Sequence, residues 1–411
     1  MVFTSDGLRI GIVGVGAIGS GVAQLVSSLG AETVIVSPRE GGVERARSMM
    51  KSCYWGDVER GRISEQQAEE GYSRLRFSSD YEDLDGSDFV IESVPENLEI
   101  KQQVLRNTQA VVGKDCIFGT NTSSIPIARI AEAADRPEVV IGTHYFWPAH
   151  RYKLVEISRA PLTSEETLSR TLDFLEWQDK TVLVVRDKPG FYTTRILLPY
   201  VNEAVALVLE GAQIEEVDSA MVDFGWAMGP FRLMDAAGLE TLVNVYRFVQ
   251  DELGERIAVL GSLTPLVQAG FKGYSGGSRE EAKGFYRYPK GAEADGRIYK
   301  ILGQEAGKSP PPEEIRYRPN YQMINEVGHC LDEGVVKTHE KADMGAVLGI
   351  GWPADKSGPI AFTRLHGPEK IAAMLETWAS KHGPRFKPSR TLIELAKADS
   401  SSKAMHASQI S

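Results

Sequence analysis

Short apolar runs alternate with longer segments of mixed polarity through the first half of the chain. Runs typical of buried strands lie at residues 8–13, 32–37, 88–94, 116–123, 139–146 and 180–187. The segment between the first two runs carries apolar residues at helical spacing and stops at Gly30. Strands that alternate with helices predict an α/β fold with a Rossmann-type, doubly wound parallel sheet.

The pattern changes at residues 187–190, which read Asp-Lys-Pro-Gly. From Phe191 onwards the apolar positions follow helical spacing, and a Pro-rich stretch at 307–314 interrupts them before a second helical block begins. We therefore predict domains at residues 1–187, 188–306 and 313–397. The small polar residues of 398–411 predict a disordered tail.

The two helical blocks resemble one another. The sequence YVNEAVALVLEG at 200–211 matches MINEVGHCLDEG at 323–334, with an Asn-Glu pair and a final glycine in register. Asp218 precedes the pair Gly229-Pro230 in the first block, and Asp343 precedes the pair Gly358-Pro359 in the second. We interpret this as an internal duplication that gives two homologous all-α domains. Chance similarity between two amphipathic helices is the alternative.

Composition excludes several functional classes. The 411 residues carry a net charge of −10, which argues against general binding of nucleic acids or anionic membranes. The three cysteines are scattered without a CxxC pair, so no metal site or disulfide framework is predicted. No signal-like N-terminus and no run of about 18 apolar residues is found. The sequence is thus typical of a cytoplasmic protein.

A glycine-rich turn follows the first predicted strand. In the sequence GVGAIG, Gly14 allows a tight turn, Gly16 lets the backbone approach a pyrophosphate, and Gly19 allows close packing of helix and strand. The phosphates would lie at the N-terminus of the following helix. The predicted cofactor-binding residues here are Gly14, Gly16, Ala17, Ile18 and Gly19. A glycine turn that binds nothing is the alternative.

The end of the second predicted strand bears on the choice of cofactor. An acidic residue there would accept both ribose hydroxyls of NAD, but this sequence has Ser37, followed by Pro38 and Arg39. No carboxylate repels a 2′-phosphate at that position, and Arg39 could pair with it. We therefore expect NADP or NAD, with a preference for NADP. Alternatively, Arg39 is solvated and Glu40 takes the place of the acid.

Together these motifs resemble the L-3-hydroxyacyl-CoA dehydrogenase family. The resemblance rests on GVGAIGSGVA, VIESVPENLEIKQQV, GTNTSSIPI, HYFWPAHRYKLVEI, KPGFYTTRILLPYVNEA and MGPFRLMDAAGLET, in the order and spacing of that family over about residues 8–290. Residues 314–397 are similar to the extra C-terminal repeat of the multifunctional fatty-acid-oxidation α subunit. No counterpart of that subunit's hydratase half is expected here.

The resemblance gives a role to two polar residues in apolar surroundings. His144 lies in a strand-like run and Glu156 follows twelve residues later. Burying either group unpaired would cost several kcal/mol, about 2–7 for a neutral polar group and more for a charge. Family members use a histidine base that a glutamate orients, and His144 and Glu156 occupy those motif positions. Histidine titrates near neutrality and suits proton transfer, and two adjacent strands could bring the pair face to face. A purely structural pair is the alternative.

Further site residues follow from the same resemblance. Ser123 matches a family serine that hydrogen-bonds substrate and cofactor, and Asn121 begins its loop. Glu96 and Lys101 match positions near the nicotinamide ribose. For Asn121 the alternative is local turn chemistry, and for Glu96 and Lys101 it is a solvated charge at the start of a helix.

Three positions depart from the family pattern. Trp147 replaces an asparagine in the loop after the histidine. Thr194 replaces an asparagine that helps to hold the substrate carbonyl, and a threonine hydroxyl is shorter and offers one donor. Glu280 lies near the place of a family lysine that reaches the cofactor. A negative charge there does not favour a phosphate-bearing ligand, unless Arg279 substitutes for the lysine. The acid–base pair is thus intact, while the groups that hold the substrate have changed.

These observations predict an NAD(P)-dependent oxidoreductase that interconverts a 3-hydroxyacyl thioester and its 3-oxo form. We expect the thioester to be linked to CoA. His144, Glu156, Ser123 and Thr194 are the predicted catalytic residues. The second helical block is expected to pack on the first, which predicts a monomer or a homodimer that uses another face. Two alternatives remain: the same mechanism on a 3-hydroxy acid without CoA, and a catalytically weakened binding or assembly protein of the same fold.

Overall fold

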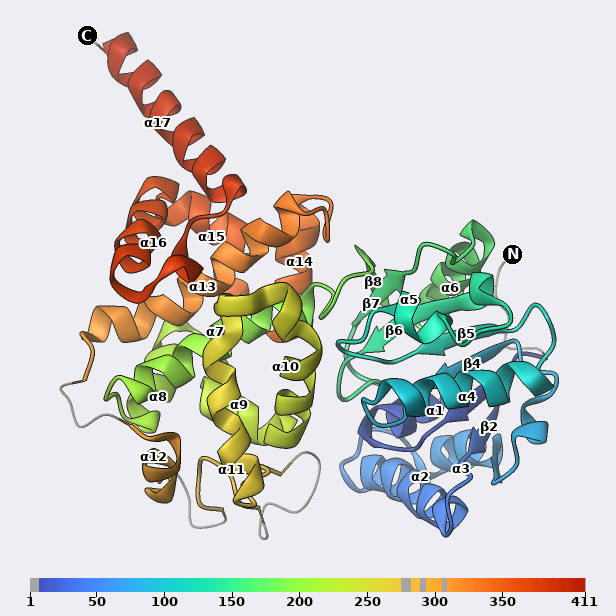
Figure 1. Cartoon of the computed structure of the whole chain (residues 1–411). Coiled ribbons are helices and arrows are strands. Elements are labelled where there is room, and N and C mark those ends of the chain that lie inside the picture. Colours follow the sequence, from blue (N-terminus) through green and yellow to red (C-terminus); the bar gives the residue numbers. More distant parts are fainter. Residues whose placement is uncertain (1–6, 275–281, 289–292, 305–308, 411) are drawn as a thin grey trace. The chain divides into compact units, whose positions relative to one another are not determined.

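The computed structural model describes residues 7–274, 282–288, 293–304 and 309–410, and it divides into two compact units (Figure 1). The first unit spans residues 1–191 and the second spans residues 192–411. The division falls four residues after the predicted end of the first domain. Both predicted helical domains lie within the second unit.

The first unit is built on one eight-stranded sheet with the strand order β3-β2-β1-β4-β5-β6-β7-β8. The strands are β1 (Arg9–Val13), β2 (Glu32–Val36), β3 (Leu75–Ser78), β4 (Phe89–Glu92), β5 (Ile117–Thr120), β6 (Val140–Tyr145), β7 (Leu154–Arg159) and β8 (Thr181–Arg186). The order reverses at β1, between β2 and β4. Ligands of such sheets bind at the carboxyl ends of the strands near this point.

The sheet is parallel from β1 to β6, but the last two strands run the other way. Strands β6 and β7 pair antiparallel, and β7 and β8 are parallel to one another. The connection at 146–153 explains the reversal, because a parallel crossover needs roughly a dozen residues or more, usually with a helix. The predicted α/β class is confirmed, but the prediction of a sheet that is parallel throughout is corrected, because β6 and β7 are antiparallel.

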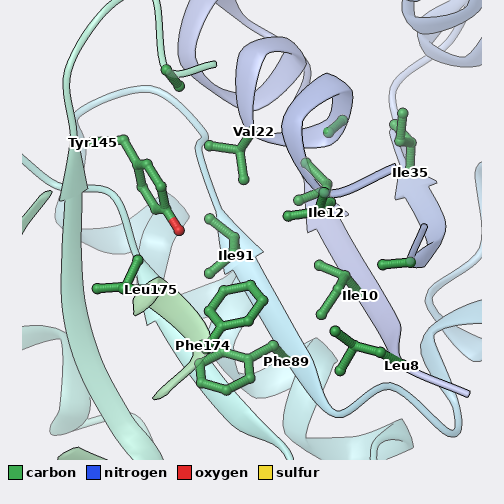
Figure 2. Packing of buried hydrophobic residues seen from close by; sticks show 14 of the residues in the cluster. Leu8, Ile10, Ile12, Val22, Ile35, Phe89, Ile91, Tyr145, Phe174 and Leu175 are labelled. Carbon is green, nitrogen blue, oxygen red and sulfur yellow. The ribbon is translucent and has the colours of Figure 1, made fainter. Parts of the chain in front are cut away.

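Helices cover both faces of the sheet, as the predicted doubly wound arrangement requires. The helices of this unit are α1 (Ala17–Ser28), α2 (Gly42–Glu59), α3 (Glu65–Ser73), α4 (Leu98–Val111), α5 (Ile127–Ala131) and α6 (Glu165–Trp177). One core cluster joins residues of α1, α2, α3 and α6 to Ile10 and Ile12 of β1 and to Phe89 and Ile91 of β4 (Figure 2). Phe174 of α6 stacks on Phe89 with ring centroids 4.4 Å apart.

The opposite face of the sheet is covered by α4 and α5. Side chains alternate between the two faces along a strand, so Val90 and Phe118 point away from the cluster of Figure 2, and neither belongs to it. A Cβ added at Gly142 of β6 would lie 2.7 Å from Ile127 of α5. The glycine therefore lets α5 lie close to the sheet, and the buried β6 keeps helices on both sides.

The second unit is helical. Its helices are α7 (Thr193–Leu209), α8 (Ile214–Phe224), α9 (Pro230–Ala237), α10 (Leu239–Leu253), α11 (Thr264–Gln268), α12 (Arg297–Leu302), α13 (Pro312–Asp332), α14 (His339–Ile350), α15 (Pro359–His366), α16 (Pro368–His382) and α17 (Arg390–Ile410). The last helix differs from the predicted tail at 398–411. Residues 398–410 contain no glycine or proline to end a helix, so α17 continues through them.

The two halves of this unit repeat the same interactions. Asp218 accepts hydrogen bonds from the first N–H groups of α9, and Asp343 accepts equivalent bonds from α15. Asn202 and Asn325 both accept a backbone N–H from a later segment of their own half. These equivalent contacts support the interpretation of residues 200–211 and 323–334 as copies.

Helices α7 and α13 lie together and exchange buried ion pairs. Arg195 of α7 donates to Glu326 of α13 at 2.7 Å, and Arg318 of α13 donates to Glu203 of α7 at 2.8 Å. All four side chains are at most 1% exposed. The second half therefore packs on the first in a nearly symmetric manner, as the sequence predicts. Among the described residues, no helix is long and apolar enough to cross a membrane.

Candidate active site

The glycine turn between β1 and α1 has the shape that a dinucleotide requires. Gly14 has a φ of 97°, and a Cβ there would lie 2.6 Å from the carbonyl oxygen of Ser93. A Cβ at Gly19 would lie 2.1 Å from the carbonyl oxygen of Gly14. A Cβ at Gly16 would meet nothing within 4 Å. Two glycines thus close the turn, while the third leaves its outer side open.

The start of α1 offers N–H groups at that open side. Gly16 is the N-cap residue of α1 and is exposed, as is Ala17, while Ile18 is half-buried and Gly19 is buried. No side chain caps this helix end. Since free N–H groups at a helix N-terminus favour anions, the residues fit the pyrophosphate of a dinucleotide.

A shallow hollow of about 520 Å³ lies at the end of β2. It is lined by Arg39, Glu40 and Glu44 together with residues of β3, among them Ser78. Ser37, half-buried, donates its N–H to the carbonyl of Ser78. One cation and two carboxylates line the same hollow, so both the expectation for Arg39 and the alternative for Glu40 are compatible with this geometry.

His144 and Glu156 face one another across paired strands. They are directly opposite in the antiparallel register of β6 and β7, and Nδ1 of His144 lies 3.0 Å from Oε2 of Glu156. His144 is 8% exposed and Glu156 is fully buried. The predicted pairing of the two residues is therefore observed, and no other side-chain hydrogen bond of His144 is found in the described part of the chain.

Aromatic rings surround the imidazole. The ring of Phe146 lies 4.6 Å from that of His144, and the ring of Phe191 lies 6.4 Å away. His144 is the next-to-last residue of β6, which is parallel to β5. It therefore lies at the same edge of the sheet as the glycine turn, the edge where strands of this fold bind ligands.

The loop after β5 is held by Glu96. Its Oε1 accepts hydrogen bonds from the hydroxyl of Thr122, the N–H of Ser123, and both the N–H and the hydroxyl of Ser124, at 2.7–3.0 Å. Burial alone would raise the pKa of Glu96, but Lys101 and these hydrogen bonds outweigh it and hold the pKa below its usual value. Glu96 thus keeps its charge and fixes the backbone beside Ser123.

Lys101 is fully buried between two carboxylates. Its Nζ lies 2.9 Å from Oε1 of Glu92 and 3.5 Å from Oε2 of Glu96. Burial would lower the pKa of Lys101, but the two carboxylates raise it above its usual value. The alternative that Glu96 and Lys101 are solvated charges is therefore wrong.

Sequence reasoning missed Glu92, the last residue of β4. It is fully buried and also accepts hydrogen bonds from the hydroxyl of Thr120 and the N–H of Val94, both at 2.6 Å. A charged residue at the end of an apolar strand was the available signal. Its partner Thr120 comes from a different strand, which sequence spacing does not indicate.

Asn121 connects this group to β6. Its Oδ1 accepts the N–H of Tyr145 at 2.7 Å, and its own N–H donates to the carbonyl of Glu92. Local turn chemistry, the alternative for Asn121, does not describe these long-range contacts. The residue instead fixes the loop of Ser123 beside the strand of His144.

The remaining predicted positions lie elsewhere. Trp147 is 63% exposed in the β6–β7 connection. Thr194 is half-buried in the first turn of α7, in the second unit. Arg279 and Glu280 lie outside the described residues. Within the described ranges, no group of three or more His, Cys, Asp and Glu side chains is placed to hold a metal ion.

A Rossmann-type sheet with a dinucleotide turn and a histidine–carboxylate pair at the same edge defines the class of nicotinamide-dependent dehydrogenases. Residues 9–188 match the family model described as 3-hydroxyacyl-CoA dehydrogenase, NAD binding domain, and residues 190–288 match that of the C-terminal domain. The chain belongs to the 3-hydroxyacyl-CoA dehydrogenase family. The predicted family is confirmed, and its first matched domain is the family's NAD-binding domain.

Solved structures agree with this assignment. The (S)-3-hydroxybutyryl-CoA dehydrogenase of Ralstonia eutropha is 31% identical, with 64% of this chain and 95% of that chain covered and a TM-score of 0.61. The 3-hydroxybutyryl-CoA dehydrogenase of Escherichia coli K12 shares the fold over 96% of this chain and 99% of that chain, with a TM-score of 0.82 at 23% identity.

A curated relative extends the similarity into the second helical block. The fatty acid oxidation complex subunit alpha of Shewanella amazonensis is 35% identical over 390 residues, which cover 94% of this chain and 54% of the relative. The chain thus spans about half the length of the curated relatives that it matches.

Proposed function

We propose that the protein is an NAD(P)-dependent oxidoreductase that interconverts a 3-hydroxyacyl-CoA thioester and its 3-oxoacyl form. The observation that carries the proposal is the 3.0 Å contact between His144 and Glu156 at the edge of the sheet that also bears the glycine turn. Family membership supports the substrate class. The names of the structural relatives, two 3-hydroxybutyryl-CoA dehydrogenases, point to the same class.

The proposed oxidation breaks one C–H bond and one O–H bond of the substrate. The hydride goes to the cofactor and the proton goes to the protein. A bound nicotinamide would supply the acceptor for the hydride that leaves C3 of the substrate. Nε2 of His144 accepts the proton of the 3-hydroxyl, and the C–O bond becomes a carbonyl. In the reverse direction the imidazolium returns that proton to the oxygen.

Glu156 makes His144 suitable for this task. Its carboxylate faces Nδ1, so it holds the proton on that nitrogen and leaves Nε2 as the acceptor. The carboxylate also stabilises the imidazolium that forms. We assign to Ser123 the positioning of the substrate hydroxyl, and to Thr194 part of the role of the family's asparagine.

An assay of 3-oxoacyl-CoA reduction tests the proposal directly. Loss of reduced-nicotinamide absorbance is followed with a panel of 3-oxoacyl-CoA thioesters of increasing chain length and with the matching acids without CoA. We expect turnover with the thioesters, and a kcat/KM lower by at least about tenfold with the free acids, since the CoA contacts are lost.

Two outcomes would contradict this expectation. Equal kcat/KM with and without CoA would favour a dehydrogenase of free 3-hydroxy acids. Cofactor binding without turnover on any substrate would favour the weakened binding protein, a reading that the changed residues Trp147 and Thr194 motivate.

The finer proposal for the cofactor is that NADP(H) binds more tightly than NAD(H). Ser37 replaces the usual acidic residue, and Arg39 lines the hollow at the end of β2. With NADPH as cofactor, reduction of the 3-oxo form is the expected direction. Arg39→Ala should weaken NADP(H) more than NAD(H), as measured by titration calorimetry.

The matched control for that measurement is Arg129→Ala, which removes an exposed cation from α5. It should leave both affinities unchanged. A native preference for NAD(H), or an equal loss of both affinities in Arg39→Ala, would show that Glu40 or another group selects the cofactor.

A further inference from the structure

The charged side chains near the ends of β4 and β5, the buried Glu92 and Lys101 and the partly buried Glu96, do not balance. Glu92 and Glu96 are both held by donors alone, namely N–H groups, hydroxyls and the ammonium of Lys101. Carboxylates that accept only hydrogen bonds are ionised. Among the residues that the structure describes, Lys101 is the one cation in contact with either of them. The Glu92–Lys101–Glu96 cluster therefore carries a net charge of −1.

Cross-linking the strands does not require this excess charge. Each buried ion loses several kcal/mol of hydration, and apolar residues of similar volume often hold a structure as well or better. Glu92 and Lys101 would already form a neutral pair. The second carboxylate, Glu96, whose side chain is 14% exposed, adds a charge that the pair does not compensate, and ionisable groups that burial and a charged partner perturb cluster at functional sites.

The cluster lies beside the reacting groups of the proposed site. Glu92 and Thr120 are the last residues of β4 and β5, at the edge of the sheet that carries the glycine turn. Asn121 links the cluster to the strand of His144 through the N–H of Tyr145. Hydride transfer requires the nicotinamide ring to reach the same substrate carbon whose hydroxyl His144 deprotonates, so the ring and the cluster share this edge.

We propose that the Glu92–Lys101–Glu96 cluster selects the oxidation state of the bound cofactor by favouring the oxidised nicotinamide over the reduced one. The oxidised ring carries a positive charge and the reduced ring is neutral, whereas the rest of the cofactor is the same in both. A fixed negative charge nearby acts on that difference alone. This inference rests on the proposed function, since it requires a nicotinamide at this edge.

The size of the effect follows from Coulomb's law. Two unit charges about 12 Å apart interact by the equivalent of about a tenfold change in affinity when the effective dielectric constant is near 20. Neutralising the cluster should therefore raise the ratio of the dissociation constants, oxidised over reduced, by roughly tenfold.

The test measures both dissociation constants, by titration calorimetry or by the fluorescence of the reduced nicotinamide, in variants of defined charge. Glu92→Gln and Glu96→Gln each bring the cluster to zero. The double variant Glu92→Gln with Lys101→Met restores −1. Glu99→Gln removes an exposed carboxylate from the first turn of the same helix α4 and serves as the matched control.

We expect the ratio to rise about tenfold in either folded single variant, to return to within about threefold of the wild-type value in the double variant, and to stay unchanged in Glu99→Gln. A purely structural role predicts something else, because the double variant removes more contacts than Glu92→Gln and would bind worse. Circular dichroism of each variant verifies folding. The two single variants are independent, so one that fails to fold leaves the other to decide.

Two results would overturn the inference. A ratio that is unchanged in both single variants while turnover persists would refute the charge effect and leave the proposed function intact. If the ratio of dissociation constants in the double variant shifted as far as in Glu92→Gln, the change would come from altered structure and not from charge. Failure of the wild type to bind either form of the cofactor would refute the proposed function, and this inference with it.

Discussion

At the scale of the residue, the pairing of His144 with Glu156 yields the sharpest prediction. Replacing His144 with glutamine should lower kcat by about 10²–10⁴-fold with cofactor affinity retained, because the proton acceptor is lost. Glu156→Gln should lower kcat by the same factor or by a smaller one. The double variant should cost little more than the worse single, since groups that act as one unit are not additive. Steady-state kinetics and calorimetry measure these quantities.

A purely structural pair would behave differently. The variants would then show a lower melting temperature, while the folded fraction would keep full activity. Thermal unfolding of each variant, measured beside its kcat, separates these outcomes.

A second residue-scale prediction concerns the carboxyl group of Asp235. Burial raises its pKa to about 6, with Asp218 adding to the rise and the N–H groups of Phe285 and Tyr286 opposing it. Because the folded pKa exceeds the unfolded value of 3.8, the folded state binds the proton more readily. The contribution of Asp235 to the free energy of unfolding therefore falls as pH rises from about 4 to about 6.

The comparison of wild type with Asp235→Asn isolates this contribution. The free energy of unfolding of the wild type, relative to the variant, should fall by up to about 3 kcal/mol between pH 4 and pH 6. Urea unfolding at several pH values measures it. The control Asp223→Asn alters an exposed carboxylate and should give a flat difference. A rising difference for Asp235→Asn would refute the assignment.

How far the sequence predicts the site depends on whether a contact is local in the sheet. His144 and Glu156 are separated by one short connection, so two adjacent strands can bring them face to face, and the family resemblance predicted that they form a pair. Glu92 meets Lys101 and Thr120 through packing between a helix and two strands. Such contacts depend on the register of separate elements, and no periodicity along the chain encodes it.

At the scale of the element, the buried ion pairs between α7 and α13 predict a large cost for removing one charge. Arg318 is fully buried and donates to Glu203 at 2.8 Å and to Glu210 at 2.6 and 2.7 Å. Arg318→Met should lower the free energy of unfolding of the second unit by up to about 3–5 kcal/mol, because the buried Glu203 keeps only its ion pair with Arg385 and the partly exposed Glu210 loses its arginine. Urea unfolding followed by circular dichroism measures it.

The control for this prediction is Lys381→Met. Lys381 also contacts a carboxylate, that of Glu314, but its side chain is 54% exposed, so the cost should stay within about 1 kcal/mol. Equal effects of the two substitutions would show that burial does not set the cost. Since Arg318 lies outside the proposed catalytic residues, kcat of the folded Arg318→Met variant should stay near that of the wild type.

Most strands with strong apolar runs were predicted, whereas β3 and β7 are not among the predicted runs. The six predicted runs correspond to β1, β2, β4, β5, β6 and β8, with ends that differ by at most three residues. Strand β3 has only four residues, LRFS, of which one is buried, and it lies at the edge of the sheet. An edge strand with so little buried surface gives no clear apolar pattern in the sequence. Its pairing with β2 stabilises β3 as a strand where its own residues give no strong strand preference.

At the scale of the whole molecule, the duplication accounts for the construction of the second unit. A single helical half would expose the face of α7 that carries Arg195 and Glu203, and the second half supplies Glu326 and Arg318 to that face. The sequence predicted this packing because the copies keep an Asn-Glu pair in register. It did not predict the exchange of arginines, in which Arg195 and Arg318 each donate to a glutamate of the other copy, although Arg318 also lies 3.8 Å from Glu314 of its own copy.

This construction yields a prediction about association in solution. Because the face between α7 and α13 is occupied within one chain, a second copy cannot use it. Sedimentation velocity over a concentration series should show the 45.1 kDa chain as a monomer, or as a dimer formed through another face. In the second case Arg318→Met and the control Lys381→Met should leave the dimer dissociation constant unchanged, because neither side chain would lie in the interface. A dimer that Arg318→Met weakens by tenfold or more, and Lys381→Met does not, would show that the α7–α13 contact forms between chains.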